Sequence, residues 1–284
     1  MDGVAEVTFE QVARQPVESR GERFDYGSEA PFQFGVLRVP AGDGPFAVAA
    51  IVHGGCWLAA YDYRHVERMA EVLTARGLAT WVIEYRRIGH AGGGWPGTFR
   101  DVARGLDHLR VLAAGHRLDL ARVVVVGHSA GGQLALWLAA RPKVAAGSEL
   151  YVAEPLSVAG VVVLAGITDL RSYALGSGSC NAAVPDLMGG LARSVGNRYD
   201  EASPLELVPL GVAVRLVHGA VDAIVPIEQS RRFVDAERRG KGDVALDVIP
   251  LAGHFDLVAP FAPAWSTVEK RIIELVARAE RVPR

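Results

Sequence analysis

Three residues of the types that cooperate in nucleophilic catalysis occur in this chain in the order Ser129, Asp222 and His254. A serine hydroxyl attacks a carbonyl carbon only when a base removes its proton, and histidine is the usual base. A carboxylate beside the histidine decides which ring nitrogen carries the hydrogen. Together the three residues predict acyl transfer through a covalent serine intermediate.

Ser129 stands in the pentapeptide GHSAG, which follows four valines and precedes an apolar run of helical period. The pattern G-x-S-x-G between a strand and a helix is typical of a tight turn that exposes a nucleophilic serine. Gly127 and Gly131 must be small there, because side chains two residues before and after would collide. A dinucleotide-binding turn is the rival interpretation, but it needs a glycine where Ser129 stands. The pattern therefore favours a nucleophile turn.

His254 is the histidine best placed to act as the base. It lies in LAGHFD, between the last expected strand and the last helix, at the carboxyl edge of the expected sheet. His65, His108 and His116 lie in or beside helices ahead of the serine and are expected to face solvent. His218 ends a strand, where a bond to the backbone is expected.

Asp222 is the expected acid, because HGAVDAIVP places it in the loop after the preceding strand. The resulting order of serine, acid and histidine is that of the α/β hydrolases. Asp169, in GITDL after an earlier strand, is the rival acid. Asp256 is too close to His254 for the same geometry and is interpreted as a helix-start residue.

The segment IVHGGCW ends an early strand and could stabilise an oxyanion. Backbone amides in such a loop bind the negative charge that develops on a carbonyl oxygen under attack. The expected donors are the amides of Gly55, Cys56 and Ala130, with Gly54 shaping the turn. His53 is expected to anchor the loop by hydrogen bonding.

Short β-branched runs alternate with segments of helical period, which predicts an α/β fold with a mainly parallel sheet and helices on both faces. The expected strands are 46–53, 79–85, 122–128, 160–166, 212–219 and 245–251, with 32–40 as an antiparallel edge. The expected helices are 62–77, 98–114, one starting at Ser129, and one opening near Pro263. With no repeat or low-complexity tract, residues 1–284 are interpreted as one domain.

Residues 167–211 break this alternation as an insertion after the sixth strand. Segments of this length inside a compact domain are usually lids or binding segments, so a small lid is expected. The alternative is a helical excursion that covers a face of the sheet.

Composition excludes several classes of partner. Thirty basic and 32 acidic residues leave a net charge of -2 without a basic block, which argues against nucleic acid and anionic membranes. No window approaches 18 apolar residues, and the N-terminus lacks the apolar stretch of a secretory signal, so a cytoplasmic protein is expected. Cys56 and Cys180 make neither a disulfide scaffold nor a zinc site; a bridge between them is left open, as is a homodimer.

The segments HGGCW, GHSAGG, HGAVDAIVP and AGHFD together resemble the α/β-hydrolase superfamily over about residues 30–280. The H-G-G-x-W loop with G-H-S-A-G is similar to the kynurenine formamidase branch and to bacterial carboxylesterases near it. Lipase-like relatives often carry a third glycine where Cys56 stands. The resemblance implies an α/β-hydrolase fold and a triad of Ser129, Asp222 and His254, without a metal or organic cofactor.

The first functional expectation is hydrolysis of short acyl or aryl carboxylic esters. The second is an arylformamidase that opens N-formylkynurenine, and the third a non-catalytic binding protein on the same scaffold. The expected partner is a small-molecule ester or formamide. Candidate pocket residues cluster in the loops at the carboxyl edge: Trp57, Tyr61, Leu170, Tyr173, Met188, Ile224 and Phe255.

Overall fold

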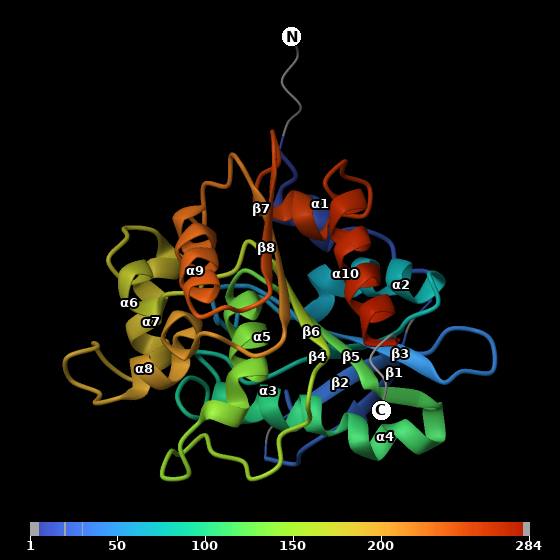
Figure 1. Cartoon of the computed structure of the whole chain (residues 1–284), viewed down its shortest axis with the longest axis horizontal. Coiled ribbons are helices and arrows are strands. Elements are labelled where there is room, and N and C mark those ends of the chain that lie inside the picture. The colour runs from blue at the N-terminus through green and yellow to red at the C-terminus, as the bar shows by residue number, and fades with distance from the viewer. Residues whose placement is uncertain (1–5, 20, 30, 281–284) are drawn as a thin grey trace.

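An eight-stranded sheet forms the centre of the molecule, in the order β1-β2-β4-β3-β5-β6-β7-β8 (Figure 1). The computed structural model describes residues 6–19, 21–29 and 31–280. The strands are β1 (Glu22–Asp25), β2 (Phe34–Arg38), β3 (Phe46–Val52), β4 (Ala79–Ile83), β5 (Leu118–His128), β6 (Gly160–Leu164), β7 (Ala213–Gly219) and β8 (Val244–Ile249). The β1–β2 and β2–β4 pairs are antiparallel, and the remaining pairs are parallel.

The strands β3 and β6 are apolar throughout, and both of their faces are buried. In β3, Val48, Ala50 and Val52 belong to one hydrophobic cluster, whereas Ala49 and Ile51 belong to the other. Successive side chains of a strand point to opposite faces, so a strand covered on both sides has no polar alternation. This explains why uninterrupted β-branched runs predicted these strands.

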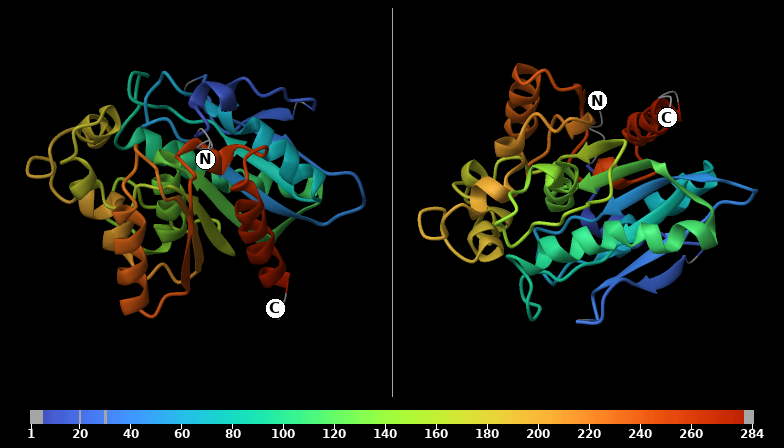
Figure 2. Two further views of the ribbon diagram at one scale, coloured as in Figure 1. Left: turned by 90° about the horizontal axis from the view of Figure 1, so that it is seen from above. Right: turned by 60° about the horizontal axis from the view of Figure 1, so that its bottom comes forward.

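Helices cover both faces of the sheet, as predicted (Figures 1 and 2). Residues of α3 (Gly97–Asp107), α4 (Leu109–His116), α5 (Ala130–Ala140), α6 (Leu170–Tyr173), α7 (Ser179–Met188), α8 (Arg198–Ala202) and α9 (Glu228–Arg239) join the first cluster. Residues of α1 (Phe9–Ala13), α2 (Glu67–Ala75) and α10 (Trp265–Glu280) join the second. The short 3-10 turns are η1 (Tyr63–Val66), η2 (Arg141–Lys143), η3 (Pro204–Leu207) and η4 (Phe255–Val258).

Two elements differ from the expectation. β2 is antiparallel but is not the edge, because the short polar strand β1 lies outside it. The single helix expected over 98–114 is broken at His108 into α3 and α4. There the indole of Trp81 donates to the carbonyl of Gly105 at 2.8 Å, so this carbonyl is engaged outside the helix.

The insertion at 167–211 folds into α6, α7, α8 and η3 (Figure 2). Leu170, Val184, Leu187 and Tyr199 are at most 1% exposed and belong to the first cluster. The segment therefore packs on the hydrophobic core.

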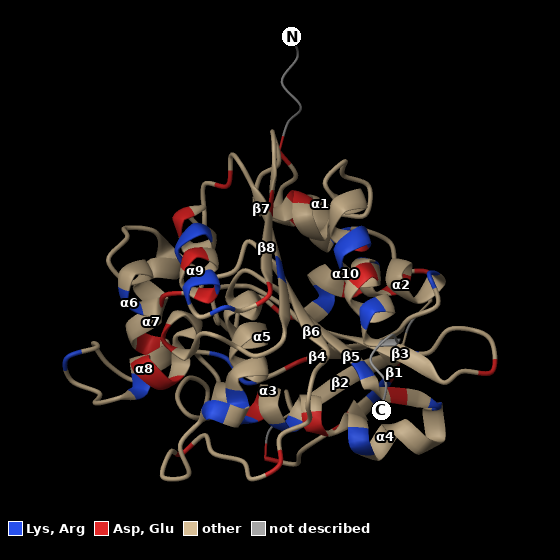
Figure 3. Cartoon of the chain, in the orientation of Figure 1, with Lys and Arg blue, Asp and Glu red and all other residues tan. Residues whose placement is uncertain are grey.

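Charged residues of both signs are mixed along α9 and α10 (Figure 3). Arg271 of α10 pairs with Asp247 and with Glu274. Within the described ranges, no helix combines the length and apolar character that crossing a membrane requires.

Candidate active site

Ser129 occupies the turn between β5 and α5 with a positive φ of 55° and a ψ of −121°, a conformation that L-residues rarely adopt. Its neighbours two residues away must be glycine. A Cβ at Gly127 would lie 2.2 Å from the carbonyl oxygen of Gly131, and one at Gly131 would lie 2.1 Å from that of Val52. The amide of Ser129 donates to the carbonyl of Leu164 at 2.8 Å, which ties the turn to β6.

Asp222 and His254 meet at the carboxyl edge of the sheet, after β7 and β8. His254 Nδ1 donates to Asp222 Oδ2 at 2.7 Å, and both side chains are buried. Because a carboxylate only accepts, Nδ1 carries the hydrogen and Nε2 keeps its lone pair. This is the tautomer in which Nε2 can take a proton from a hydroxyl group.

The environment keeps Asp222 ionised. Burial alone would raise its pKa, but the hydrogen bond and charge of His254 outweigh burial and hold the pKa below its usual range. The amides of Ile224 and Val225 help by donating to Oδ1 at 2.8 and 2.9 Å. A charged Asp222 is what fixes the tautomer of His254.

The other candidate acids and bases have structural partners. Asp169 caps α6 by accepting from the amide of Ser172 at 3.1 Å. Asp256 lies in the first turn of η4, in line with the expected helix start, and its carboxylate accepts the amides of Val7 and Gly253. His218 Nε2 donates to a backbone carbonyl at 2.9 Å, as expected.

The loop after β3 presents amides beside Ser129. A Cβ at Gly54 would lie 3.1 Å from Ser129 Cβ, so the loop lies directly against the serine. Within the described part of the chain, the amides of Gly55 and Cys56 donate to no protein group. Ala130 is the first residue of α5, where amides also lack a helical partner. These three amides are therefore available to an oxygen of a bound ligand.

Buried charges anchor this loop. His53 Nδ1 lies 2.8 Å from the carbonyl oxygen of Gly54, and its Nε2 lies 3.1 Å from Glu84 Oε1. Arg87 pairs with Glu84 and donates to the carbonyl of Tyr61 farther along the loop. His53 therefore lies where an anchoring residue was expected.

A cavity of about 280 Å³ opens beside Ser129 and His254. Of the predicted pocket residues, Tyr61, Ile224 and Phe255 line it. The structure places four others in the hydrophobic core instead, each at most 2% exposed: Trp57, Leu170, Tyr173 and Met188. An apolar residue in a loop after a strand can equally point into the core, and residue type alone does not separate the two cases.

Several cavity residues were not predicted. Phe9, His65, Ser179 and Cys180 also line the cavity. His65 was expected to face solvent, but it is only 3% exposed. His65 belongs to the 3-10 turn η1 ahead of α2, so the spacing of apolar residues along α2 does not predict which way its side chain points.

His65 and His128 are buried as neutral rings. Burial, followed by the neighbouring His53, lowers the pKa of His65 to about 3. Burial, followed by the charge of His254, likewise holds the pKa of His128 well below its usual range. Both histidines therefore bind protons less readily in the folded chain than in the unfolded chain.

This difference predicts acid sensitivity. In the unfolded chain, His65 is protonated as the pH falls below about 6.5, whereas in the folded chain its pKa is about 3. The free energy of unfolding therefore decreases as the pH falls between these two values. Between pH 7 and pH 5, His65 alone should remove roughly 2 kcal/mol from the free energy of unfolding. Urea unfolding of wild type and His65→Phe at both pH values measures this, and the variant should lose roughly 2 kcal/mol less. Equal losses in the two proteins would contradict the assignment.

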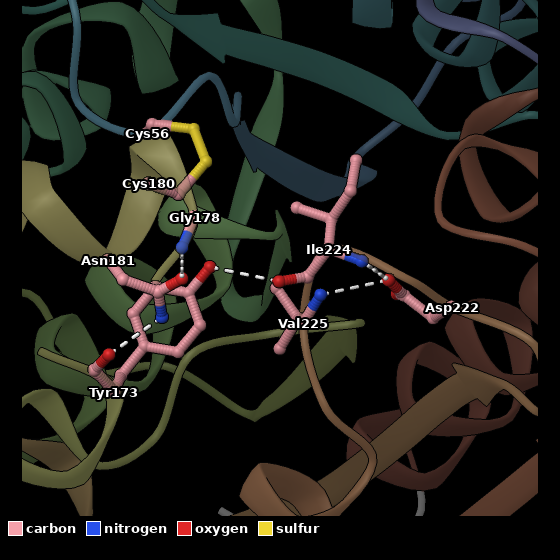
Figure 4. The surroundings of a disulfide bond; sticks show 8 residues. All are labelled: Cys56, Tyr173, Gly178, Cys180, Asn181, Asp222, Ile224 and Val225. Atoms are coloured by element: carbon pink, nitrogen blue, oxygen red, sulfur yellow. Dashed lines mark hydrogen bonds between the residues drawn. A yellow bond between two sulfur atoms is a disulfide. The ribbon is translucent and has the colours of Figure 1, made fainter. Parts of the chain in front are cut away.

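A disulfide joins Cys56, in the loop after β3, to Cys180 of α7 (Figure 4). The two residues are 124 positions apart, with their Cα atoms 4.9 Å from each other. The bond decides the pairing that the sequence left open. It ties the insertion at 167–211 to the loop that lies against Ser129, and both cysteines line the cavity.

Reduction of this bond is expected to lower the free energy of unfolding by about 2–5 kcal/mol, because it releases a long loop in the unfolded chain. Urea unfolding with and without a phosphine reductant measures the change. The double variant Cys56→Ala/Cys180→Ala is the control, since it should unfold like the reduced protein and ignore the reductant. Two free thiols in the unreduced, unfolded wild type would refute the bond.

Comparisons with known proteins were made for the whole chain. A family model described as BD-FAE matches residues 37–236. Esterase LipC of Mycobacterium tuberculosis is 29% identical over 229 residues, which are 75% of this chain and 54% of that protein. The chain thus spans about half the length of this curated relative.

Solved structures share the fold. Esterase B from Lactobacillus rhamnosis superposes with a TM-score of 0.80 at 18% identity, over 96% of this chain and 92% of that chain. An esterase from Thermogutta terrifontis, Est2, gives a TM-score of 0.74 at 19% identity, over 93% and 96%. At these identities the likeness concerns the course of the backbone.

Proposed function

The chain belongs to the BD-FAE family and has the α/β-hydrolase fold, and on this premise we propose that it is a serine carboxylesterase for short esters. One observation carries the proposal. The hydrogen bond of 2.7 Å between Asp222 and His254 orients Nε2 as a base, in the cavity that Ser129 also lines. The esterase names of the relatives favour an ester over the formamide that the sequence also suggested.

In the proposed mechanism, His254 Nε2 takes the proton of Ser129 as Oγ attacks the carbonyl carbon of the ester. Negative charge moves to the carbonyl oxygen, where the amides of Gly55, Cys56 and Ala130 stabilise it. The protonated ring, held by Asp222, then gives its proton to the departing alkoxide, which leaves an acyl-serine. Water then attacks the acyl carbon as His254 takes its proton, and His254 returns that proton to Ser129 Oγ as the acid is released.

The size of the cavity supports short substrates. A volume of about 280 Å³ lies at the lower end of the range for small-molecule pockets. Structures of Est2 are described with propionate or butyrate bound, and acids of that size would fit such a space. The insertion at 167–211 contributes Ser179 and Cys180 to the wall, so we assign it a part in substrate selection.

A substrate panel tests the proposal. We expect kcat/KM for p-nitrophenyl acetate and butyrate to exceed that for N-formylkynurenine by at least one order of magnitude. A preference for the formamide by orders of magnitude would replace the esterase with an arylformamidase. The absence of turnover on every member would favour the non-catalytic scaffold.

The cytoplasmic location expected from the N-terminal residues stays a prediction. The disulfide between Cys56 and Cys180 argues against it, because such bonds persist mainly in oxidising compartments.

A further inference from the structure

His65 lines the cavity beside Ser129 but takes no part in the proposed proton transfers. Its Nδ1 lies 2.8 Å from the carbonyl oxygen of Asp62. A carbonyl only accepts, so Nδ1 carries the hydrogen and Nε2 presents a lone pair. The ring is neutral at physiological pH because burial lowers its pKa to about 3. His65 therefore offers an acceptor at Nε2 and no positive charge.

The lone pair of Nε2 has no protein partner in the described part of the chain. His128 Nδ1 is buried without a hydrogen-bond partner, whereas His65 Nε2 is not fully buried. Since His65 is only 3% exposed and lines the cavity, its open atom faces the space where substrate would lie.

A cluster of aromatic rings on the cavity wall reaches His65 through Phe9. The ring of Phe9 lies 5.7 Å from that of His65, 5.1 Å from Tyr61 and 5.7 Å from Phe255, between ring centres. All four residues line the cavity. A small number of polar groups beside apolar ones is how small-molecule sites fix the orientation of a ligand. A hydrogen bond is also stronger electrostatically in such a poorly solvated place.

We propose that His65 is a specificity-determining residue that accepts a hydrogen bond from a hydroxyl group of the substrate. The inference rests on the proposed esterase function and narrows its substrates to esters that carry a hydroxyl group a few bonds from the reacting carbonyl. The apolar remainder of such an ester packs against Phe9 and Phe255. An ester without the hydroxyl group leaves Nε2 without a partner, which costs binding free energy.

Binding of intact esters to Ser129→Ala tests this without turnover. Phenyl butyrate and phenyl 3-hydroxybutyrate probe the acyl half, and propyl benzoate and 3-hydroxypropyl benzoate probe the alcohol half. Ligand-observed NMR gives the dissociation constant of each. We expect at least one hydroxylated ester to bind about 3- to 10-fold more tightly than its partner.

Variants of His65 in the Ser129→Ala background complete the test. His65→Phe should abolish the preference, and His65→Gln, which keeps an acceptor, should retain part of it and guards against misfolding of the first variant. His116→Phe, at the end of α4 and outside the cavity lining, should keep the full preference. Each readout is a ratio of two esters, so an effect common to both cancels.

Two results would overturn the inference: equal binding within both pairs, or a preference that survives His65→Phe. Hydrolysis of phenyl butyrate by the wild type separately reports the esterase function. A protein that binds the hydroxylated ester through His65 but hydrolyses nothing would refute the proposed function and leave the role of His65 intact.

Discussion

Replacing Ser129 with alanine is expected to lower kcat for p-nitrophenyl butyrate by about 10⁶-fold. The loss follows because the alanine side chain cannot form an acyl intermediate, and His254 is left without a proton to take. The residual hydrolysis in Ser129→Ala comes from the backbone amides of the cavity, which still polarise the carbonyl group of the ester. Alanine meets the same backbone conformation at φ 55° as serine, so the fold should be unchanged, which circular dichroism can check.

The control for this variant is another serine of the same cavity. Ser179 lies at the start of α7, is exposed, and lines the cavity with Ser129. A fluorophosphonate probe should label wild type and Ser179→Ala at Ser129, and should not label Ser129→Ala. Labelling that disappears with Ser179 instead would move the nucleophile to the insertion and refute the assignment of Ser129.

The fold was predictable because buried parallel strands leave a clear pattern. The runs of valine at 123–126 and 161–163 predict central strands, and the comparisons confirm the α/β-hydrolase fold. Parallel strands end at one edge of the sheet, so residues directly after the neighbouring strands β7 and β8 had to meet there. Asp222 and His254 do so at 2.7 Å, although 32 positions separate them.

The cavity wall was harder to predict, because it depends on contacts between distant segments. Phe9 belongs to α1, whose start at Thr8 and Gln11 is a capping box that the sequence displays. The capping box predicts that a helix begins there, but not which distant segment the helix packs against. The amide of Val7 reaches Asp256 at 3.1 Å, a pairing over 249 positions that no local pattern encodes.

Replacing Asp222 with asparagine is expected to lower kcat by about 10⁴-fold with little change in folding. Asp222 Oδ1 accepts the amides of Ile224 and Val225, so the asparagine must place its oxygen there and turn its NH₂ group toward His254. The NH₂ group donates to Nδ1 and moves the ring hydrogen to Nε2. Nε2 then has no lone pair to accept the proton of Ser129.

The rival acid Asp169 supplies the matched control for this variant. Its carboxylate accepts the amide of Ser172 as the N-cap of α6, a role that asparagine fills equally well. Asp169→Asn should therefore keep kcat within about threefold of wild type, since its carboxylate caps α6 and has no hydrogen bond to His254 in the described part of the chain. The kcat of both variants is measured with p-nitrophenyl butyrate. If Asp169→Asn lost several orders of magnitude in kcat while Asp222→Asn stayed active, the catalytic acid would be Asp169, in the loop after β6. The hydrogen-bond pattern predicts the opposite ranking, because Asp222 contacts both the base and the turn that fixes its own orientation.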